Sequence, residues 1–402
     1  MAKIISFFLT LTLFFSSLFG TGGDVKQSRR VSGNDYASAG YSLTKKINDA
    51  CFDRVFNTLH STIDGKVTAY VWPAASFAEM LTDAYRLFPG NTNVSTSYRL
   101  MLKRLLPSYL VKDAVLTLPS GETPTVSYYN VTPGASGDYY YDDNEWVCIE
   151  LLLGYQNLGD KSLLKAAETN LAFLWTGWDD HLGGGLYWSK DYFTKNTCSN
   201  APGVIAFALG YQCTGNEVYL TRAKMIYDWV NDTLGDRDGM YWDAISTNGI
   251  DRWKGAYNQA TMIYSGALLY ELTGDETYYE NAKKTVAATL PHIFEQKIND
   301  AGETVTVLRQ NPIFTAWCIG WLMRAYVRFY EVDPAKDTSA MDLALAAMKS
   351  ELATKDEDGL YDPFFCSGGS DPGGYNGLLS QCGVATSLLN VAYYDAVLNP
   401  AE

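Results

Sequence analysis

The sequence predicts an all-α protein, an (α/α)6 barrel or toroid of stacked helix pairs with short β-hairpin loops. Two interleaved repeats lead to this fold class, and one acidic helix start marks its expected site. A helix pair cannot bury its apolar face alone, so successive pairs must stack on one another. Six or so pairs favour closure into a ring, with an open helical solenoid as the alternative. Long loops gathered at one end of the ring would form a cleft.

The first repeat is a tyrosine, a glycine four residues later, and then Asp or Asn. It occurs as Tyr155 to Asp160, Tyr211 to Asn216 and Tyr270 to Asp275. The glycine can end one helix, and the Asp or Asn can cap the next. Degenerate copies surround Tyr85 and Tyr326, and a last helix from about Gly377 to Val397 completes the set.

The second repeat is a glycine-aromatic turn that follows the second helix of a unit. Its copies are Gly185-Leu-Tyr187-Trp188, Gly239-Met-Tyr241-Trp242 and Gly359-Leu-Tyr361-Asp362. These turns therefore join one helix pair to the next. The insertion over residues 107–138 is the largest interruption, and we expect it to form one rim of the site because it leads directly to Asp142.

The acidic helix start lies within residues 139–146, which read Tyr-Tyr-Tyr-Asp-Asp-Asn-Glu-Trp. From Trp146 onward, apolar residues recur at helical spacing. Asp142 can cap this helix, and Asp143 can lie in its first turn, as acidic residues ordinarily do. Consecutive helical side chains diverge by about 100°, so the two carboxyls can flank one bond. The tyrosines before them and the glycine-aromatic turns favour a catalytic pair.

The N-terminus resembles a secretory signal peptide. A short basic start precedes an apolar run over residues 4–19, and small residues follow at 20–23. A membrane anchor is the weaker alternative because the run is short and contains Thr and Ser. We expect residues 1–22 to be the signal peptide and residues 30–400 to form one catalytic domain. The mature protein would be exported, periplasmic or secreted, and monomeric.

Composition restricts the classes of ligand. A net charge of −14 without a basic run argues against nucleic acid and anionic membranes as partners. Seven scattered cysteines and three histidines show no metal-ligand spacing, so we expect no metal and no cofactor. The 14% of aromatic residues fits either a large helical core or a groove that stacks sugar rings. Together these features favour a neutral carbohydrate.

Amide side chains open several of the expected helices. They occur in Lys195-Asn196-Thr197-Cys198-Ser199-Asn200, in Tyr257-Asn258-Gln259 and in Asn311-Pro312. Each can be a helix cap, or it can recognise sugar hydroxyls because amides both donate and accept hydrogen bonds. A similar choice applies to Asp179 and Asp180, which either fix the geometry of their glycine-rich turn or bind hydroxyls.

These motifs together resemble glycoside hydrolase family 76. The resemblance rests on residues 141–146, Trp178-Asp179-Asp180, Gly183-Gly184-Gly185-Leu186-Tyr187-Trp188, Lys195-Asn196, Ser199-Asn200, Tyr257-Asn258-Gln259 and Leu272-Thr273-Gly274-Asp275. It implies an (α/α)6 endo-α-1,6-mannanase that acts with retention, with Asp142 as nucleophile and Asp143 as general acid/base. We expect substrate contacts from Tyr141, Trp146, Asp179, Asp180, Gly184, Tyr187, Trp188, Asn196, Asn200, Tyr257, Asn258 and Gln259.

Two other functions fit the same residues. One is a transglycosylase that moves a mannan chain onto a cell-wall acceptor, and the other is a mannan-binding protein without catalysis. Release of reducing ends from α-1,6-mannan would distinguish hydrolysis from both.

Overall fold

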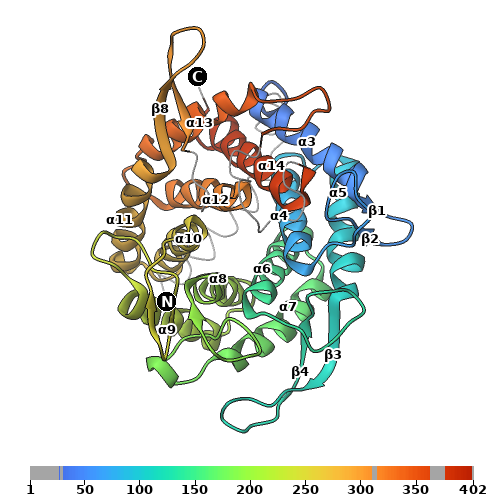
Figure 1. The fold of residues 1–402 in the computed structure, drawn as a ribbon, viewed down its shortest axis with the longest axis vertical. Coiled ribbons are helices and arrows are strands. Elements are labelled where there is room, and N and C mark those ends of the chain that lie inside the picture. Colours follow the sequence, from blue (N-terminus) through green and yellow to red (C-terminus); the bar gives the residue numbers. More distant parts are fainter. Residues whose placement is uncertain (1–26, 28–29, 310–314, 363–375, 401–402) are drawn as a thin grey trace, which may run out of the picture.

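Inner helices form a closed ring in the computed structural model, which describes residues 27, 30–309, 315–362 and 376–400 (Figure 1). They are α4 (Val71–Leu87), α6 (Tyr141–Leu158), α8 (Thr197–Thr214), α10 (Ala256–Thr273), α12 (Ala316–Val332) and α14 (Leu378–Tyr393). Each packs against the next, and α14 packs against both α12 and α4. The predicted (α/α)6 toroid is therefore confirmed, and an open solenoid is excluded.

Outer helices cover the ring. They are α3 (Asp35–Cys51), α5 (Thr92–Leu100), α7 (Lys161–Leu174), α9 (Glu217–Leu234), α11 (Glu276–Ile293) and α13 (Ser339–Leu352). Each of the last five follows its inner helix in sequence, whereas α3 packs on α14. The two ends of the described chain therefore make the sixth pair. Between these ends, Nδ2 of Asn34 donates to Oδ2 of Asp395 at 2.6 Å.

The tight turns within pairs have the predicted chemistry. Gly159, Gly215 and Gly274 end α6, α8 and α10 in the left-handed conformation, with φ of 65°, 71° and 70°. Glycine adopts this conformation without the steric cost of a Cβ atom. The next residues cap the outer helices by accepting a main-chain N–H: Asp160, Asn216 and Asp275.

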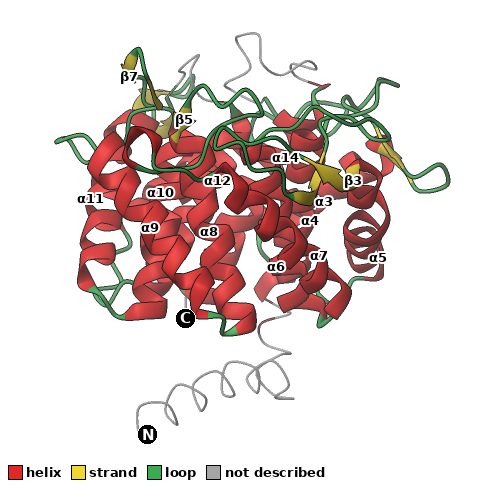
Figure 2. Cartoon of the chain, turned by 90° about the horizontal axis from the view of Figure 1, so that it is seen from below, coloured by secondary structure: helices red, strands yellow, loops and turns green. Residues whose placement is uncertain are grey.

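The connections between pairs gather at the opposite end, here called the loop-bearing end (Figure 2). Their short strands pair in antiparallel fashion. Three sheets of the described chain are two-stranded hairpins: β1 (Phe52–Asp53) with β2 (Thr58–Leu59), β3 (Leu110–Val115) with β4 (Thr125–Tyr129), and β8 (Phe294–Ile298) with β9 (Thr304–Leu308). In the fourth sheet, β6 (Ala244–Ser246) lies between β5 (Lys195–Asn196) and β7 (Gly249–Asp251) and pairs with both. The predicted insertion contains β3 and β4. The pairing of β5 with β6 brings the start of α8 beside the second glycine-aromatic turn.

An amide at the fourth position of an inner helix fixes the loop before it in four of the pairs. Each side chain accepts from the N–H and donates to the C=O of one loop residue. The pairs are Asn144 with Tyr129, Asn200 with Leu186, Gln259 with Tyr241, and Gln381 with Tyr361. Buried main-chain groups need such partners, and the repeated use of an amide at one position satisfies them.

The thiols of Cys148 and Cys318 are buried, while Cys213 is only partly buried. Among the described helices, none is long and apolar enough to cross a membrane. The predicted signal peptide and the helix start at Asn311-Pro312 lie outside the described residues. The extent of the catalytic domain, residues 30–400, stays a prediction.

Candidate active site

The aspartate pair lies in the first turn of α6, at the loop-bearing end of the ring. The residue that precedes the helix is Tyr140, which makes no side-chain cap, so the prediction that Asp142 caps the helix is wrong. The reason is non-local: Tyr140 bridges to Ser189, and the N–H of Tyr141 donates to the carbonyl of Trp188 at 2.8 Å. The loop that contains Gly183 to Trp188, here called the Gly-rich turn, thus sets where α6 begins.

Asp142 is held by donors from two other segments. Nε1 of Trp188 donates to Oδ2 of Asp142 at 3.0 Å, and the thiol of Cys198 on α8 lies 3.5 Å from the same oxygen. Oδ1 accepts the N–H of Asp143 at 2.9 Å. The Trp188 ring is 38% exposed and packs on Tyr140, with ring centroids 5.0 Å apart. Trp188 therefore offers an aromatic surface next to a fixed carboxylate.

The two carboxyls lie in different electrostatic environments. Burial raises the pKa of Asp142 to about 6, against the hydrogen bonds from Trp188, the Asp143 N–H and Cys198, which favour the ionised form. Burial, and then the charges of Asp142 and Asp138, raise the pKa of Asp143 well above its usual range. One member of the pair can thus be ionised while its neighbour holds a proton. An acid and a nucleophile or base can then act on one substrate.

A third carboxyl lies one turn further along α6. Glu145 is fully buried, and neither of its oxygens has a hydrogen-bond partner in the described structure. Burial, with a smaller effect of Asp142, raises the pKa of Glu145 well above the usual range, which favours the protonated form of the side chain. Gly203 of α8 leaves room for it, since a Cβ there would lie 3.1 Å from Oε1 of Glu145.

Asp243 is a half-buried carboxylate that sequence reasoning missed. Its Oδ1 accepts from Nδ2 of Asn258 at 2.9 Å and from the hydroxyl of Tyr257 at 3.4 Å, and its Oδ2 accepts from Nδ2 of Asn196 at 3.4 Å. Burial raises its pKa, and these donors oppose the shift. Three predicted site residues are therefore brought together around one carboxylate. The available signal was an acidic residue immediately after the second glycine-aromatic turn.

The Gly-rich turn is organised by a buried lysine. Nζ of Lys195 donates to Oδ1 of Asp179 at 2.6 Å and to the carbonyls of His181 and Gly184 at 2.7 and 2.8 Å. Asp179 also accepts the hydroxyl of Tyr187 at 3.0 Å. These contacts fit the interpretation that Asp179 fixes the geometry of the turn.

The other residues of this turn differ in exposure. Asp180 is exposed, whereas Tyr187 and Gly184 are buried. Gly184 has a φ of 126°, and a Cβ there would lie 3.0 Å from the rings of Trp178 and Trp229. Gly184 is thus required for close packing.

Four other predicted site residues lie inside the protein. Tyr141 stacks on Phe173 with ring centroids 5.0 Å apart, and Trp146 packs among the inner helices. Asn200 and Gln259 are fully buried and use their amides to hold the loops, as described above. The structure places these four as supports of the site. Among the described residues, no group of three or more His, Cys, Asp or Glu side chains is arranged to hold a metal ion.

The sequence profile of glycosyl hydrolase family 76 matches residues 40–388, which is most of the chain. The chain belongs to this family. It is similar to mannan endo-1,6-α-mannosidase DCW1 of Candida glabrata, with 30% identity over 130 residues. That alignment spans 29% of this chain and 29% of the length of the relative.

Solved structures of the family share the fold. The mannosidase Bt3792 of Bacteroides thetaiotaomicron matches 90% of this chain and 99% of its own, with a TM-score of 0.76 and 18% identity. An inactive variant of the α-1,6-mannanase GH76A of Salegentibacter sp. HEL1_6 matches 90% of this chain and 100% of its own, with a TM-score of 0.72 and 22% identity. Two adjacent aspartates are replaced by asparagine in that variant, which is in complex with α-1,6-mannotriose.

Proposed function

We propose that this family 76 hydrolase is an exported, monomeric enzyme that cleaves α-1,6-mannosidic linkages within mannan chains and retains the anomeric configuration. The curated relatives carry the name mannan endo-1,6-α-mannosidase. A structural neighbour that binds α-1,6-mannotriose was made inactive by replacing two adjacent aspartates. Asp142 and Asp143 are an adjacent pair at the loop-bearing end of the same fold.

The reaction proceeds in two displacements. In the first, the carboxylate of Asp142 attacks the anomeric carbon, and the bond from that carbon to O6 of the leaving chain breaks. Asp143 gives its proton to the departing O6. In the second, ionised Asp143 takes a proton from water, and the water oxygen attacks the anomeric carbon. The ester to Asp142 then breaks. Each step inverts the anomeric carbon, so the product has the starting configuration.

The hydrogen bonds to Asp142 are the main support for assigning it as the nucleophile and Asp143 as the acid. Trp188 and Cys198 both donate to its Oδ2, which favours a negative charge there. The side chain of Asp143 has no hydrogen bond or ion pair within the described residues, and the charge of Asp142 favours its protonated form. Asp142 is therefore the nucleophile, and Asp143 is the acid. Retaining glycosidases in general use two carboxyls about 5–5.5 Å apart, and this chemistry requires no cofactor.

Substrate binding is assigned to the Asp243 cluster and to Trp188. Asn196, Tyr257 and Asn258 fix Asp243, which can accept hydrogen bonds from two neighbouring sugar hydroxyls. The exposed ring of Trp188 can stack on the apolar face of a mannose.

The test is incubation of the purified protein with linear α-1,6-mannan, with measurement of new reducing ends and product lengths. Wild type should release oligosaccharides of several lengths, and Asp142→Asn should bind mannan but release none. Products longer than the substrate without new reducing ends would instead identify a transglycosylase. Binding without any product would identify a mannan-binding protein.

A further inference from the structure

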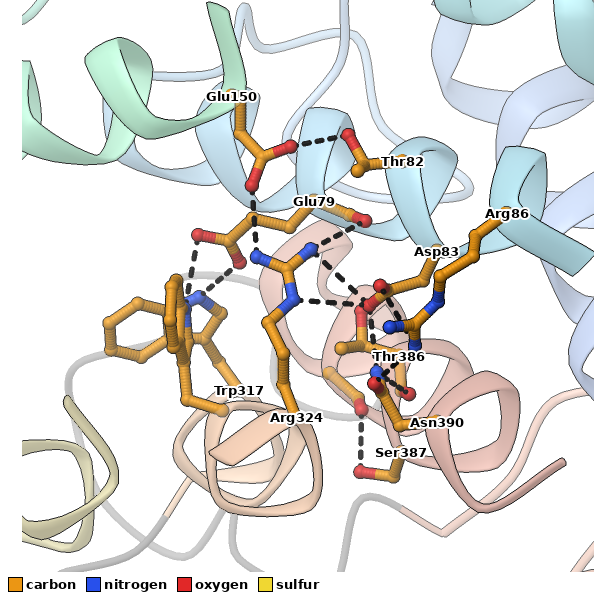
Figure 3. Close-up of polar contacts among 12 residues, drawn as sticks. Glu79, Thr82, Asp83, Arg86, Glu150, Trp317, Arg324, Thr386, Ser387 and Asn390 are labelled. Carbon is orange, nitrogen blue, oxygen red and sulfur yellow. Dashed lines mark hydrogen bonds and ion pairs between the residues drawn. The ribbon is translucent and has the colours of Figure 1, made fainter. Parts of the chain in front are cut away.

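Glu79 of α4 is bound by two indole groups of α12. The N–H of Trp317 donates to its Oε2 at 2.9 Å (Figure 3). The N–H of Trp321 donates to its Oε1 at 3.1 Å. Glu79 is 1% exposed, so this carboxyl is deep in the ring. Burying a carboxyl costs free energy unless its oxygens are hydrogen-bonded, and each oxygen of Glu79 accepts one hydrogen bond from an indole.

The two indoles support the helix that carries the aspartates. Trp146 of α6 packs edge-on against Trp317, with ring centroids 5.2 Å apart, and its ring is tilted against that of Trp321, with centroids 4.9 Å apart. Trp146 lies four residues after Asp142, about one helical turn. Trp317 also lies 6.0 Å from Tyr257, which belongs to the Asp243 cluster. The rings of Trp317 and Trp321 thus contact the helix of the aspartate pair, and Trp317 also contacts the cluster around Asp243.

The next turn of α6 is held by the same helix. Nη1 of Arg324, seven residues after Trp317 on α12, donates to Oε1 of Glu150 at 2.9 Å (Figure 3). Its Nη2 donates to the main-chain carbonyl of Glu79 at 3.1 Å, and its Nε to Asp83 at 3.3 Å. Successive turns of α6 are therefore fixed against α12, first by apolar rings and then by an ion pair.

We propose that Glu79 is a positioning residue for the aspartate pair. By fixing the indoles of Trp317 and Trp321, it sets the height and rotation of α6, and with them the direction of Asp142 and Asp143. An apolar side chain at position 79 would fill the space but leave two indole N–H groups without acceptors. The inference rests on the proposed function, since that function gives the aspartates their roles.

The test begins with Glu79→Gln, which keeps the shape of the side chain but offers one acceptor oxygen. The amide nitrogen then faces one indole N–H, and that ring must move. We expect kcat on α-1,6-mannan to fall about 10- to 100-fold, as small misplacements of reacting groups do, with KM changed less than about two-fold. The near-ultraviolet circular dichroism of the indoles should change as well. Glu351→Gln is the matched control, because Glu351 is equally buried on the outer helix α13.

The same substitution in a Trp321→Phe variant tests whether Glu79 acts through the two indoles. Trp321→Phe removes the second N–H, so the single oxygen of Gln at position 79 satisfies Trp317, and adding Glu79→Gln there should lower kcat less than about three-fold. Equal losses in both backgrounds, or a wild-type kcat in Glu79→Gln, would overturn the inference. An equal loss of kcat in Glu351→Gln would also overturn it, since replacing any buried glutamate by glutamine would then lower kcat. A wild-type protein that leaves mannan unchanged overturns the proposed function instead.

Discussion

The indole nitrogen of Trp188 lies 3.0 Å from Oδ2 of Asp142, although 46 residues separate them in the chain. The glycine-aromatic turn before α8 thus provides a donor for the first aspartate of α6. A hydrogen bond to the ionised form of a carboxyl lowers its pKa, so Trp188 holds the pKa of Asp142 below the value that burial alone would give.

Trp188→Phe should therefore raise the pKa of Asp142 above about 6. The acidic limb of the pH profile of kcat/KM on α-1,6-mannan would move to higher pH, since the nucleophile must be ionised. Trp242→Phe is the control, because Trp242 holds the equivalent place in the next repeat. An unshifted acidic limb in Trp188→Phe would show that this hydrogen bond does not set the ionisation of the nucleophile.

Asp243→Ala should weaken substrate binding more than it slows the chemical step. Hydrogen bonds to a charged acceptor contribute about 1.5–3 kcal/mol, so we expect KM to rise about 10- to 100-fold while kcat changes less. Steady-state kinetics on mannan-derived oligosaccharides measures both constants. A fall in kcat with KM unchanged would instead place Asp243 in the chemical step.

Lys195→Met should unfold the Gly-rich turn and destabilise the protein. Lys195 is fully buried, and its loss removes the ion pair of Asp179 and leaves the main-chain carbonyls of His181 and Gly184 without this donor. A buried acceptor left unsatisfied costs about 1–3 kcal/mol, and denaturant unfolding measures the loss. Lys190→Met removes an exposed ion pair to Asp138 and should cost less than about 1 kcal/mol. Equal losses in the two variants would contradict this role for Lys195.

Glu145 should make the protein less stable as the pH rises. Its pKa is raised in the folded protein, so the folded state keeps a proton that the unfolded state releases above about 4.5. Its contribution to stability is complete below that pH and is lost as the pH rises toward the folded pKa, by at most about 1.4 kcal/mol per pH unit. Glu145→Gln cannot ionise, so its free energy of unfolding should fall less steeply with pH. Parallel pH curves for the two proteins would show that Glu145 ionises normally.

The parts of the fold that depend on local chemistry could be predicted from the sequence. The left-handed glycines and the caps after them follow from single residues, as at Gly159 and Asp160. The copies of the two repeats then indicate about six helix pairs. The pairing of α3 with α14 joins the two ends of the described chain, and no local pattern encodes that contact.

The site was less predictable because its contacts are non-local. An amide in sequence does not reveal whether it meets a sugar or the main chain, and Asn200 and Gln259 meet the main chain. Asp243 is brought to the site by the pairing of β5 with β6, which are far apart in the sequence. The prediction that Asp142 caps the helix was wrong because the loop around Trp188 fixes the start of α6 at Tyr141, two residues earlier than the capping pattern suggests.

The central claim is that Asp142 is the nucleophile and Asp143 is the acid/base of a retaining pair. Asp143→Ala should be nearly inactive on mannan, because the departing O6 needs a proton. An aryl α-mannoside with a good leaving group needs none, so the ester on Asp142 should form and accumulate. Azide can enter the space left by the carboxyl and attack without a base.

The decisive measurement is therefore the configuration of the azide product made by Asp143→Ala from an aryl α-mannoside, with folding of the variant checked by circular dichroism. Two inversions at the anomeric carbon predict α-mannosyl azide and a turnover that increases with azide concentration. Recovery of β-mannosyl azide would mean a single direct displacement, and Asp142 would then not be the nucleophile.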